Sequence, residues 1–130
     1  MNATAGKRLL VVDDEPDLLS LLKVRLQANG YVVATASDGQ DALEKVRQDP
    51  PDLIILDLML PKIDGYKVCS LLKRDLRFTK IPIMLFTARA QPEDVAMGFE
   101  VGADAYVTKP FVPPLLLRKI KELLRSPQDS

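Results

Sequence analysis

The chain has 130 residues, of which 47% are hydrophobic, so it can bury the core of one domain but is too short for two ordinary ones. Its 18 lysine and arginine residues balance 18 aspartate and glutamate residues, which argues against a dedicated DNA-binding module because such modules are normally basic. The sequence contains no histidine, which excludes catalytic triads, metal sites and general bases that depend on an imidazole ring.

Five short apolar runs alternate with five amphipathic stretches along the chain. The runs are rich in valine, isoleucine and leucine and lack polar alternation, which is typical of strands buried on both faces of a sheet. In chain order they span residues 9–12, 32–36, 53–56, 81–86 and 105–107. The stretches between them carry apolar residues at helical spacing. The order is therefore βα repeated five times, which predicts a single α/β domain with a parallel sheet and helices on both faces.

Proline, glycine and aspartate mark the boundaries of these elements. Helix starts are predicted at Pro16, Pro92 and either Pro113 or Pro114, because the first turn of a helix tolerates a missing N–H. Helix ends are predicted at Gly30 and Gly102, and turns at Asp38-Gly39 and Asp64-Gly65. Polar tails are predicted at residues 1–6 and 126–130.

Polar side chains follow the apolar runs at the point where each predicted strand ends. Parallel strands end at the same edge of a sheet, and ligands of open α/β sheets bind at that edge. The side chains concerned are Asp13, Asp14 and Glu15 after the first run, Asp57 after the third, Thr87 after the fourth, and Thr108 and Lys109 after the fifth. We therefore expect these groups to converge on one site.

This set of groups indicates Mg²⁺-assisted phosphoryl chemistry. Clustered carboxylates repel one another and are costly to bury without a cation, and a site made only of oxygen ligands selects a hard ion such as Mg²⁺. The carboxylate of Asp57 can act as a nucleophile, while Lys109 and Thr87 can each contact a phosphoryl oxygen. For Asp14 a second interpretation stays open, because it can also cap the first helix before Pro16.

The residues around these groups carry a family resemblance. The sequences Val-Val-Asp13-Asp14-Glu15, Leu-Asp57-Leu-Met-Leu-Pro61, Phe-Thr87-Ala88 and Thr-Lys109-Pro110-Phe111 together resemble the response-regulator receiver family of two-component signalling, which includes the chemotaxis receivers. The match covers about residues 7 to 125, within one receiver domain that takes up residues 1–130. It implies a flavodoxin-like fold, a doubly wound (βα)5 domain whose five parallel strands have the order 2-1-3-4-5.

The resemblance also implies roles for individual residues. Asp57 is the phosphoacceptor, and Mg²⁺ is held by Asp13, Asp14 and Asp57 with the backbone carbonyl of Met59. Lys109 and Thr87 contact the phosphoryl group. Backbone N–H groups near Met59 and Ala88 do so as well, and the peptide bond between Lys109 and Pro110 is cis.

In the same family, Thr87 and Tyr106 form a switch. The threonine hydroxyl turns toward the phosphoryl group and the aromatic ring moves inward, which changes the face made by the fourth helix, the fifth strand and the fifth helix. Taken alone, Thr87 would be an ordinary hydroxyl at a strand end and Tyr106 half-buried packing. Met59 and Arg89 occupy positions that tune the rate of dephosphorylation in this family, and their bulk is expected to slow attack by water.

The implied function is that of a phosphoacceptor switch in a phosphorelay. A sensor histidine kinase or phosphotransfer protein donates the phosphoryl group, and a downstream protein or output domain responds. The domain is no enzyme beyond catalysing its own phosphorylation and autodephosphorylation, and no direct contact with nucleic acid is expected. The sequence is compatible with a stand-alone receiver and with a part of a longer regulator or hybrid kinase.

The face made by the fourth helix, fifth strand and fifth helix departs from one common pattern. Ala105 stands where an acid is common in regulators that dimerise through charges on this face, and the residues Leu115 to Leu117 make the start of the last helix apolar. We therefore expect a monomer or weak homodimer, with an apolar face that binds a protein partner or another copy.

Three other functions compete with this interpretation. A Mg²⁺-dependent phosphatase with an aspartate nucleophile usually needs a second acid two residues later, where this chain has Met59. A flavodoxin-like cofactor binder needs a phosphate-binding loop after the first strand, where the sequence Asp13-Asp14-Glu15 would repel a phosphate. A degenerate receiver that binds partners without phosphorylation would not need the intact acids, threonine and lysine.

The single cysteine and the absence of long apolar stretches bear on the compartment. Cys69 cannot form an internal disulfide, is typical of a reducing environment, and is expected to be a packed thiol on a helix. Residues 1–7 lack the apolar run of a signal peptide, and no stretch approaches the roughly 20 apolar residues of a membrane span. We expect a cytoplasmic protein that does not contact a membrane.

Overall fold

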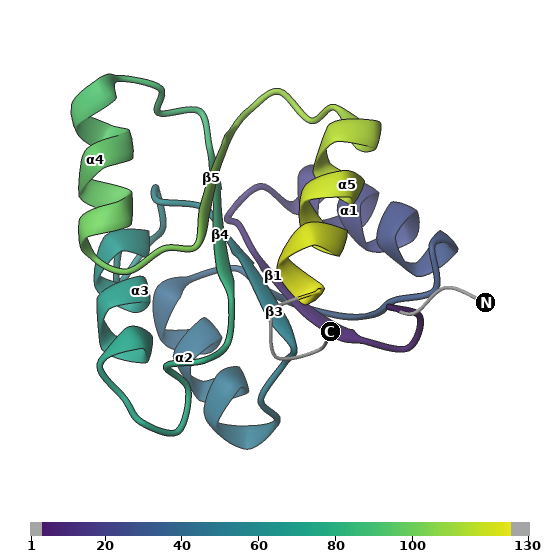
Figure 1. Ribbon diagram of the computed structural model, residues 1–130, viewed down its shortest axis with the longest axis horizontal. Coiled ribbons are helices and arrows are strands. Elements are labelled where there is room, and N and C mark those ends of the chain that lie inside the picture. Colours follow the sequence, from purple (N-terminus) through teal and green to yellow (C-terminus); the bar gives the residue numbers. More distant parts are fainter. Residues whose placement is uncertain (1–3, 126–130) are drawn as a thin grey trace.

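The computed structural model describes residues 4–125, in which five strands and five helices alternate (Figure 1). The strands are β1 (Arg8–Val12), β2 (Val32–Ala36), β3 (Leu53–Leu56), β4 (Ile83–Thr87) and β5 (Ala105–Thr108). The helices are α1 (Pro16–Ala28), α2 (Gly39–Gln48), α3 (Gly65–Lys73), α4 (Pro92–Glu100) and α5 (Pro113–Leu124). The tail predicted at residues 126–130 lies outside the described residues, as do residues 1–3.

The five strands form one parallel sheet in the order β2-β1-β3-β4-β5. This order confirms the flavodoxin-like topology that the family resemblance implied. Parallel neighbouring strands require a crossover connection. Helices α1 to α4 each connect one strand to the next, and α5 follows β5. Within residues 4–125, every helix is too short or too polar to cross a membrane.

Two hydrophobic layers sandwich the sheet. Leu9 and Val11 of β1 point into the layer shared with α1 and α5, whereas Leu10 and Val12 point into the layer shared with α2 and α3. Figure 1 shows α4 beside α3 on this second face. Strands buried on both sides have no need for polar alternation, which is why the runs are apolar at every position. Cys69 lies fully buried in the second layer, and this burial raises the pKa of its thiol to about 11, as a packed cysteine requires.

The sequence misplaced the start of the fourth strand. It predicted a strand from Ile81, but the backbone N–H of Ile81 donates to the carbonyl of Phe78 in a turn. Pro82 follows and has no backbone N–H to donate to the hydrogen-bond ladder of the sheet. The strand therefore begins at Ile83.

The two Asp-Gly pairs predicted as turns are helix starts. The carboxylate of Asp38 accepts a hydrogen bond from the backbone N–H of Asp41 at 2.7 Å, and that of Asp64 accepts one from Lys67 at 3.0 Å. Both are N-caps, which satisfy backbone N–H groups that the first helical turn leaves without a partner. An aspartate before glycine serves either purpose, so local sequence did not separate the two.

The glycine that opens α3 is required by a close approach to the end of β3. A Cβ atom on Gly65 would lie 2.3 Å from the carbonyl oxygen of Asp57, closer than any real contact. The backbone N–H of Gly65 also donates to the carbonyl of Leu58 at 2.9 Å. The start of α3 therefore packs directly on the backbone of the loop that carries Asp57.

Replacing Gly65 with alanine should lower the free energy of unfolding by about 1–3 kcal/mol, because overpacking against rigid backbone costs this much. Urea denaturation measures the change. Lys67→Ala is the matched control, since Lys67 is exposed on the same helix and its loss should change stability by about 0.5 kcal/mol or less. Equal losses in the two variants would contradict the close approach.

Candidate functional site

The strand register brings the predicted site residues to one edge of the sheet. Val12 pairs with Leu56 across β1 and β3, so Asp13 and Asp57 follow on neighbouring strands at the same height. The backbone N–H of Asp57 donates to the carbonyl of Val12 at 3.0 Å, which extends the ladder by one step. Asp13 and Asp57 are 2% and 4% exposed, so two carboxylates are buried side by side.

The fourth and fifth strands deliver the remaining groups. Thr87 is the last residue of β4 and is fully buried. It pairs with Thr108 of β5, and the backbone N–H of Lys109 donates to the carbonyl of Thr87 at 2.8 Å. The side chain of Lys109 then reaches back across the edge toward the acids. The peptide bond between Lys109 and Pro110 is cis, which confirms the expectation.

Lys109 holds the two buried carboxylates together. Its ammonium group donates to Asp13 at 2.8 Å and to Asp57 at 3.0 Å, and its side chain is 14% exposed. The same Nζ lies 5.8 Å from the centre of the Phe86 ring, whose negative face favours a cation. Phe86 in turn packs edge-on against Phe111. The Phe86 ring therefore adds a favourable contact for the ammonium group of Lys109.

Burial and hydrogen bonding shift the pKa values of Asp13 and Lys109 in opposite directions. Burial raises the pKa of Asp13, and the hydrogen bonds from Lys109 and from the backbone N–H of Glu15 only partly offset this effect. Burial alone would lower the pKa of Lys109, but its hydrogen bonds to Asp13 and Asp57 raise that pKa above the ordinary value. The lysine therefore stays charged, while burial keeps the pKa of the Asp13 carboxyl above its ordinary value.

Asp14 completes a group of three carboxylates. One oxygen from each of Asp13, Asp14 and Asp57 lies within 4.8 Å of the other two, and Asp14 is exposed whereas the others are buried. The alternative role of Asp14 as a helix cap is wrong, because the N-cap of α1 is Glu15. The side chain of Glu15 makes no capping hydrogen bond. Three oxygen donors at one point fit a hard divalent cation.

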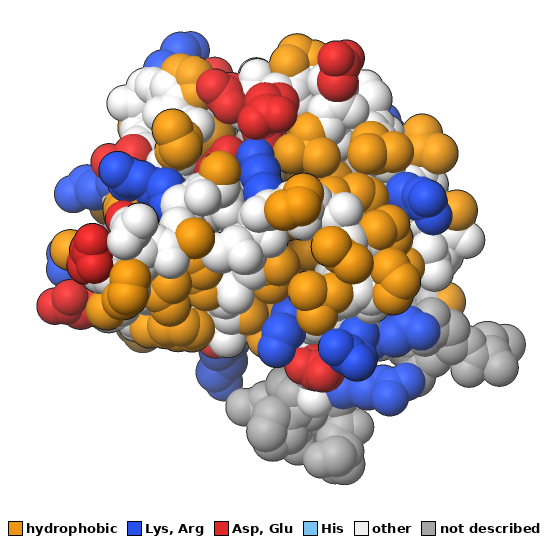
Figure 2. Space-filling view, turned by 90° about the horizontal axis from the view of Figure 1, so that it is seen from above, with side chains coloured by type: hydrophobic (Ala, Val, Ile, Leu, Met, Phe, Trp, Pro, Cys, Tyr) orange, Lys and Arg blue, Asp and Glu red, His pale blue; other side chains and the backbone are white. Residues whose placement is uncertain are grey.

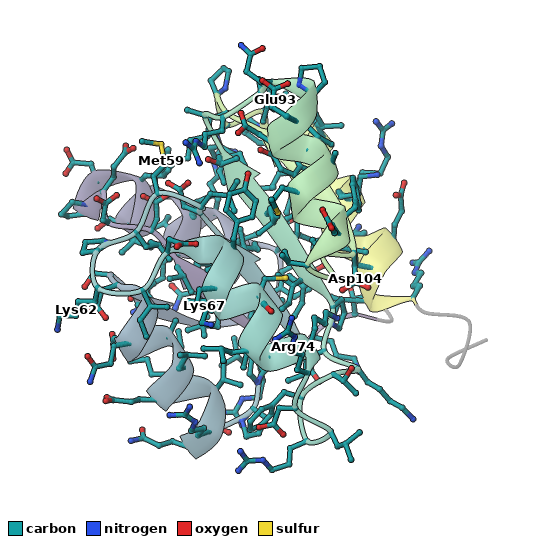
Figure 3. The ribbon with its side chains drawn as sticks, turned by 90° about the vertical axis from the view of Figure 1, so that its left-hand side faces the viewer. Met59, Lys62, Lys67, Arg74, Glu93 and Asp104 are labelled. Carbon is teal, nitrogen blue, oxygen red and sulfur yellow. The ribbon has the colours of Figure 1, made fainter. Side chains whose placement is uncertain are left out.

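On the face of the molecule seen from above, acidic and basic side chains adjoin each other and hydrophobic side chains surround them (Figure 2). Met59, in the loop after β3, lies at the same end of the molecule as Glu93 at the start of α4 (Figure 3). Met59 is 58% exposed, and its backbone N–H donates to Asp57 at 3.2 Å.

Thr87 and Tyr106 both contact the loop between β4 and α4. The backbone N–H of Arg89 donates to the Thr87 hydroxyl at 3.4 Å, and the Tyr106 hydroxyl donates to the carbonyl of Arg89 at 2.8 Å. Burial raises the pKa of Tyr106 to about 12, so its hydroxyl is a donor at neutral pH. The structure therefore brings both predicted switch residues to the same turn of backbone.

Comparison with known proteins decides the family. The family model of the response regulator receiver domain matches residues 9–121. The chain belongs to the response regulator receiver family. Receiver domains of this family bind Mg²⁺ at an acidic pocket, and the structure here gathers Asp13, Asp14 and Asp57 into an acidic cluster. Such domains are generally not enzymes, and they interact with histidine kinases and output domains.

Relatives of this receiver domain include transcriptional regulators. The chain is 48% identical over 121 residues to the alkaline phosphatase synthesis transcriptional regulatory protein PhoP of Bacillus subtilis, covering 92% of this chain and 49% of PhoP. It thus spans about half the length of the curated relatives it matches. A putative response regulator from Chloroflexus aurantiacus superposes with a TM-score of 0.89 at 35% identity, over 93% of this chain and 99% of that one. The BeF3-activated N-terminal receiver domain of Klebsiella pneumoniae RstA superposes with a TM-score of 0.85 at 29% identity, over 92% of this chain and 99% of that one.

The expected convergence extends to Glu15, because Lys109 also lies 3.5 Å from a carboxylate oxygen of this exposed residue. The sequence analysis missed the approach of Gly65 to the backbone of Asp57. That contact gave no signal of its own, because an Asp-Gly pair also suits a turn.

Replacing Asp13 with asparagine should stabilise this receiver domain more at pH 7 than at pH 4. Because burial raises the pKa of Asp13 from its ordinary 3.8, the folded protein keeps this proton to a higher pH than the unfolded chain does. The wild type therefore loses stability as the pH rises through this window, and the variant does not. Urea denaturation of both proteins at the two pH values measures the difference. Glu100→Gln, an exposed control, should show no such gain, and a gain for Asp13→Asn that is equal at both pH values would contradict the argument.

Proposed function

We propose that this receiver domain is a phosphoacceptor switch, in which Asp57 takes a phosphoryl group from a histidine kinase or phosphotransfer protein with the help of Mg²⁺. The observation that carries the proposal is the buried pair of Asp13 and Asp57 held by Lys109, with Thr87 at the end of the adjacent strand. A purely structural ion pair would not need a second buried acid or a third one nearby.

Asp57 is the nucleophile in this proposal. Its carboxylate stands at the end of the central strand β3 and has one oxygen on Lys109 and the other on the backbone N–H of Met59. An oxygen of Asp57 attacks the phosphorus of a phosphohistidine, the P–N bond breaks, and its electron pair returns to the imidazole of the donor. Fixed donors on both oxygens orient the carboxylate before the donor arrives.

Asp13, Asp14 and Asp57 would hold Mg²⁺, together with the backbone carbonyl of Met59. When bound, the ion offsets the negative charge of the carboxylates and of the transferred phosphoryl group. The geometry supports this assignment, because one oxygen from each of the three carboxylates lies within 4.8 Å of the other two. Lys109 supplies part of the charge, and its ammonium group stays protonated through the reaction.

Lys109 and Thr87 would contact the phosphoryl oxygens, as would backbone N–H groups near Met59 and Ala88. Lys109 needs only a small displacement because it already touches Asp57. The buried hydroxyl of Thr87 accepts from Arg89 at 3.4 Å, a long hydrogen bond that is readily given up for a charged acceptor. Rotation of Thr87 and inward movement of Tyr106 would then release the loop after β4 and change the face made by α4, β5 and α5.

This face is where we place the downstream partner. Phe99 of α4 and Leu115 of α5 are 49% and 40% exposed, and Ala105 of β5 is buried and carries no charge. The start of α5 is less apolar on its surface than the sequence suggested, because Leu116 lies in the core. An apolar protein surface, from an output domain, another protein or another copy of this chain, fits these side chains better than a charged one.

We further propose that the domain catalyses only its own phosphorylation and autodephosphorylation. The exposed thioether of Met59, two residues after Asp57, offers no acid for the release of a leaving group, as an aspartate-nucleophile phosphatase would require. The bulk of Met59 and Arg89 over the site is expected to slow attack by water on the phosphorylated Asp57.

Incubation with acetyl phosphate and Mg²⁺, followed by intact-mass measurement, tests the proposal. The wild type should gain one phosphoryl group only when Mg²⁺ is present, and Asp57→Asn should gain none. Asp52→Asn is the matched control, because Asp52 precedes the same strand at its other end and should leave the gain unchanged. No gain in the wild type, or an equal gain in Asp57→Asn, would contradict the proposed function.

A further inference from the structure

Residues 89–94, here called the switch segment, run from the loop after β4 into the first turn of α4. They make three hydrogen bonds to neighbouring elements, here called tethers. The backbone N–H of Arg89 donates to the Thr87 hydroxyl, and the carbonyl of Arg89 accepts from the Tyr106 hydroxyl. At the other end, the carbonyl of Asp94 accepts from the hydroxyl of Tyr66 at 3.1 Å. The first two tethers involve the proposed switch residues, and the third does not.

The tether from Tyr66 is not needed to form the helix. The start of α4 is already capped, because the side chain of Gln91 accepts from the backbone of Asp94 and the side chain of Asp94 accepts from the backbone of Gln91. The Asp94 carboxylate also lies 4.0 Å from the guanidinium of Arg89. The hydroxyl of Tyr66 adds a bond between two helices, α3 and α4, that lie on the same face of the sheet (Figure 1).

Tyr66 is well placed to connect the two loops of the site. Its ring packs against the hydrophobic layer below α3, and burial raises the pKa of its phenol, so the hydroxyl remains a donor. The preceding residue, Gly65, lies against the backbone of Asp57. One short piece of α3 therefore touches the loop of the phosphoacceptor and, through Tyr66, the start of α4. The labelled Glu93, at the start of α4, lies at the same end of the molecule as Met59 (Figure 3).

We propose that Tyr66 is a positioning residue whose hydroxyl holds the switch segment in its resting place and opposes the switch. This inference rests on the proposed function. When Thr87 turns to a phosphoryl group and Tyr106 moves inward, the two tethers on Arg89 are lost. The hydrogen bond from Tyr66 to Asp94 then still ties the switch segment to α3, and it must break for the start of α4 to move away from α3. Removing this hydroxyl lowers the free energy of the switched state relative to the resting state.

Tyr66→Phe removes the hydroxyl and leaves the packed ring. Beryllofluoride with Mg²⁺ serves as the phosphoryl mimic, and its dissociation constant is measured by titration calorimetry. The loss of one net hydrogen bond from the resting state should tighten binding by about threefold to tenfold. Tyr31→Phe is the matched control, because the Tyr31 hydroxyl is also hydrogen-bonded, to Thr4, but at the start of β2 on the opposite edge of the sheet. Its dissociation constant should equal that of the wild type.

Each outcome has one meaning. Equal or weaker binding by Tyr66→Phe than by Tyr31→Phe would overturn the role of Tyr66 while leaving the phosphoacceptor function intact. Failure of the wild type itself to bind beryllofluoride would instead contradict the proposed function, and the role of Tyr66 with it. Amide hydrogen exchange gives a second readout. Exchange in the switch segment should rise in Tyr66→Phe without ligand and match the wild type with beryllofluoride bound, whereas unchanged exchange without ligand would overturn the inference.

Discussion

A single ammonium group, that of Lys109, bonds to two buried carboxylates, those of Asp13 and Asp57. Neighbouring carboxylates destabilise a fold unless positive charge compensates them, and the exposed Asp14 adds a third. The parallel register of the sheet forces this crowding, because it ends β1 and β3 at the same height. The receiver domain therefore folds around an edge at which negative charge exceeds positive charge.

This imbalance connects the fold to the chemistry. A site short of positive charge is poised for a divalent cation, and a carboxylate held by fixed donors on both oxygens is oriented to attack. The same edge carries Thr87, whose hydroxyl is bonded to the loop before α4. In the proposed function, a change of charge at Asp57 acts through Thr87 on the loop before α4, and the core below this loop is too densely packed to deform continuously. Discrete rearrangement of the loop is the response that such packing allows.

Much of the site could be predicted from sequence because it depends on strand ends. A buried strand is recognised by its apolar run, and the residue that follows it falls at a known edge of a parallel sheet. The positions of Asp13, Asp57 and Lys109 after such runs therefore predict their convergence, which the hydrogen bonds of Lys109 confirm. The strand order came from the family resemblance and not from the residues. The bounds of two strands, 32–36 and 53–56, agree with β2 and β3.

The remaining features depend on tertiary contacts that local sequence does not encode. Asp64 caps α3 because Gly65 must lie against Asp57, whereas the pair alone also suits a turn. Leu116 turns to the core and Leu115 to the surface, a choice set by how α5 packs on the sheet. The contact between Tyr66 and Asp94 joins residues 28 positions apart on separate helices, and no spacing rule predicts it.

Mg²⁺ binding tests the central claim, that this edge is short of positive charge, most directly. The thermal midpoint of unfolding is measured with increasing Mg²⁺ for the wild type, for Asp13→Asn and for the exposed control Glu100→Gln. A ligand that binds only the folded state raises the midpoint in proportion to the logarithm of its concentration once the site is saturated. The account predicts a rise for the wild type and the control, and little or none for Asp13→Asn. An equal rise in all three proteins would contradict it.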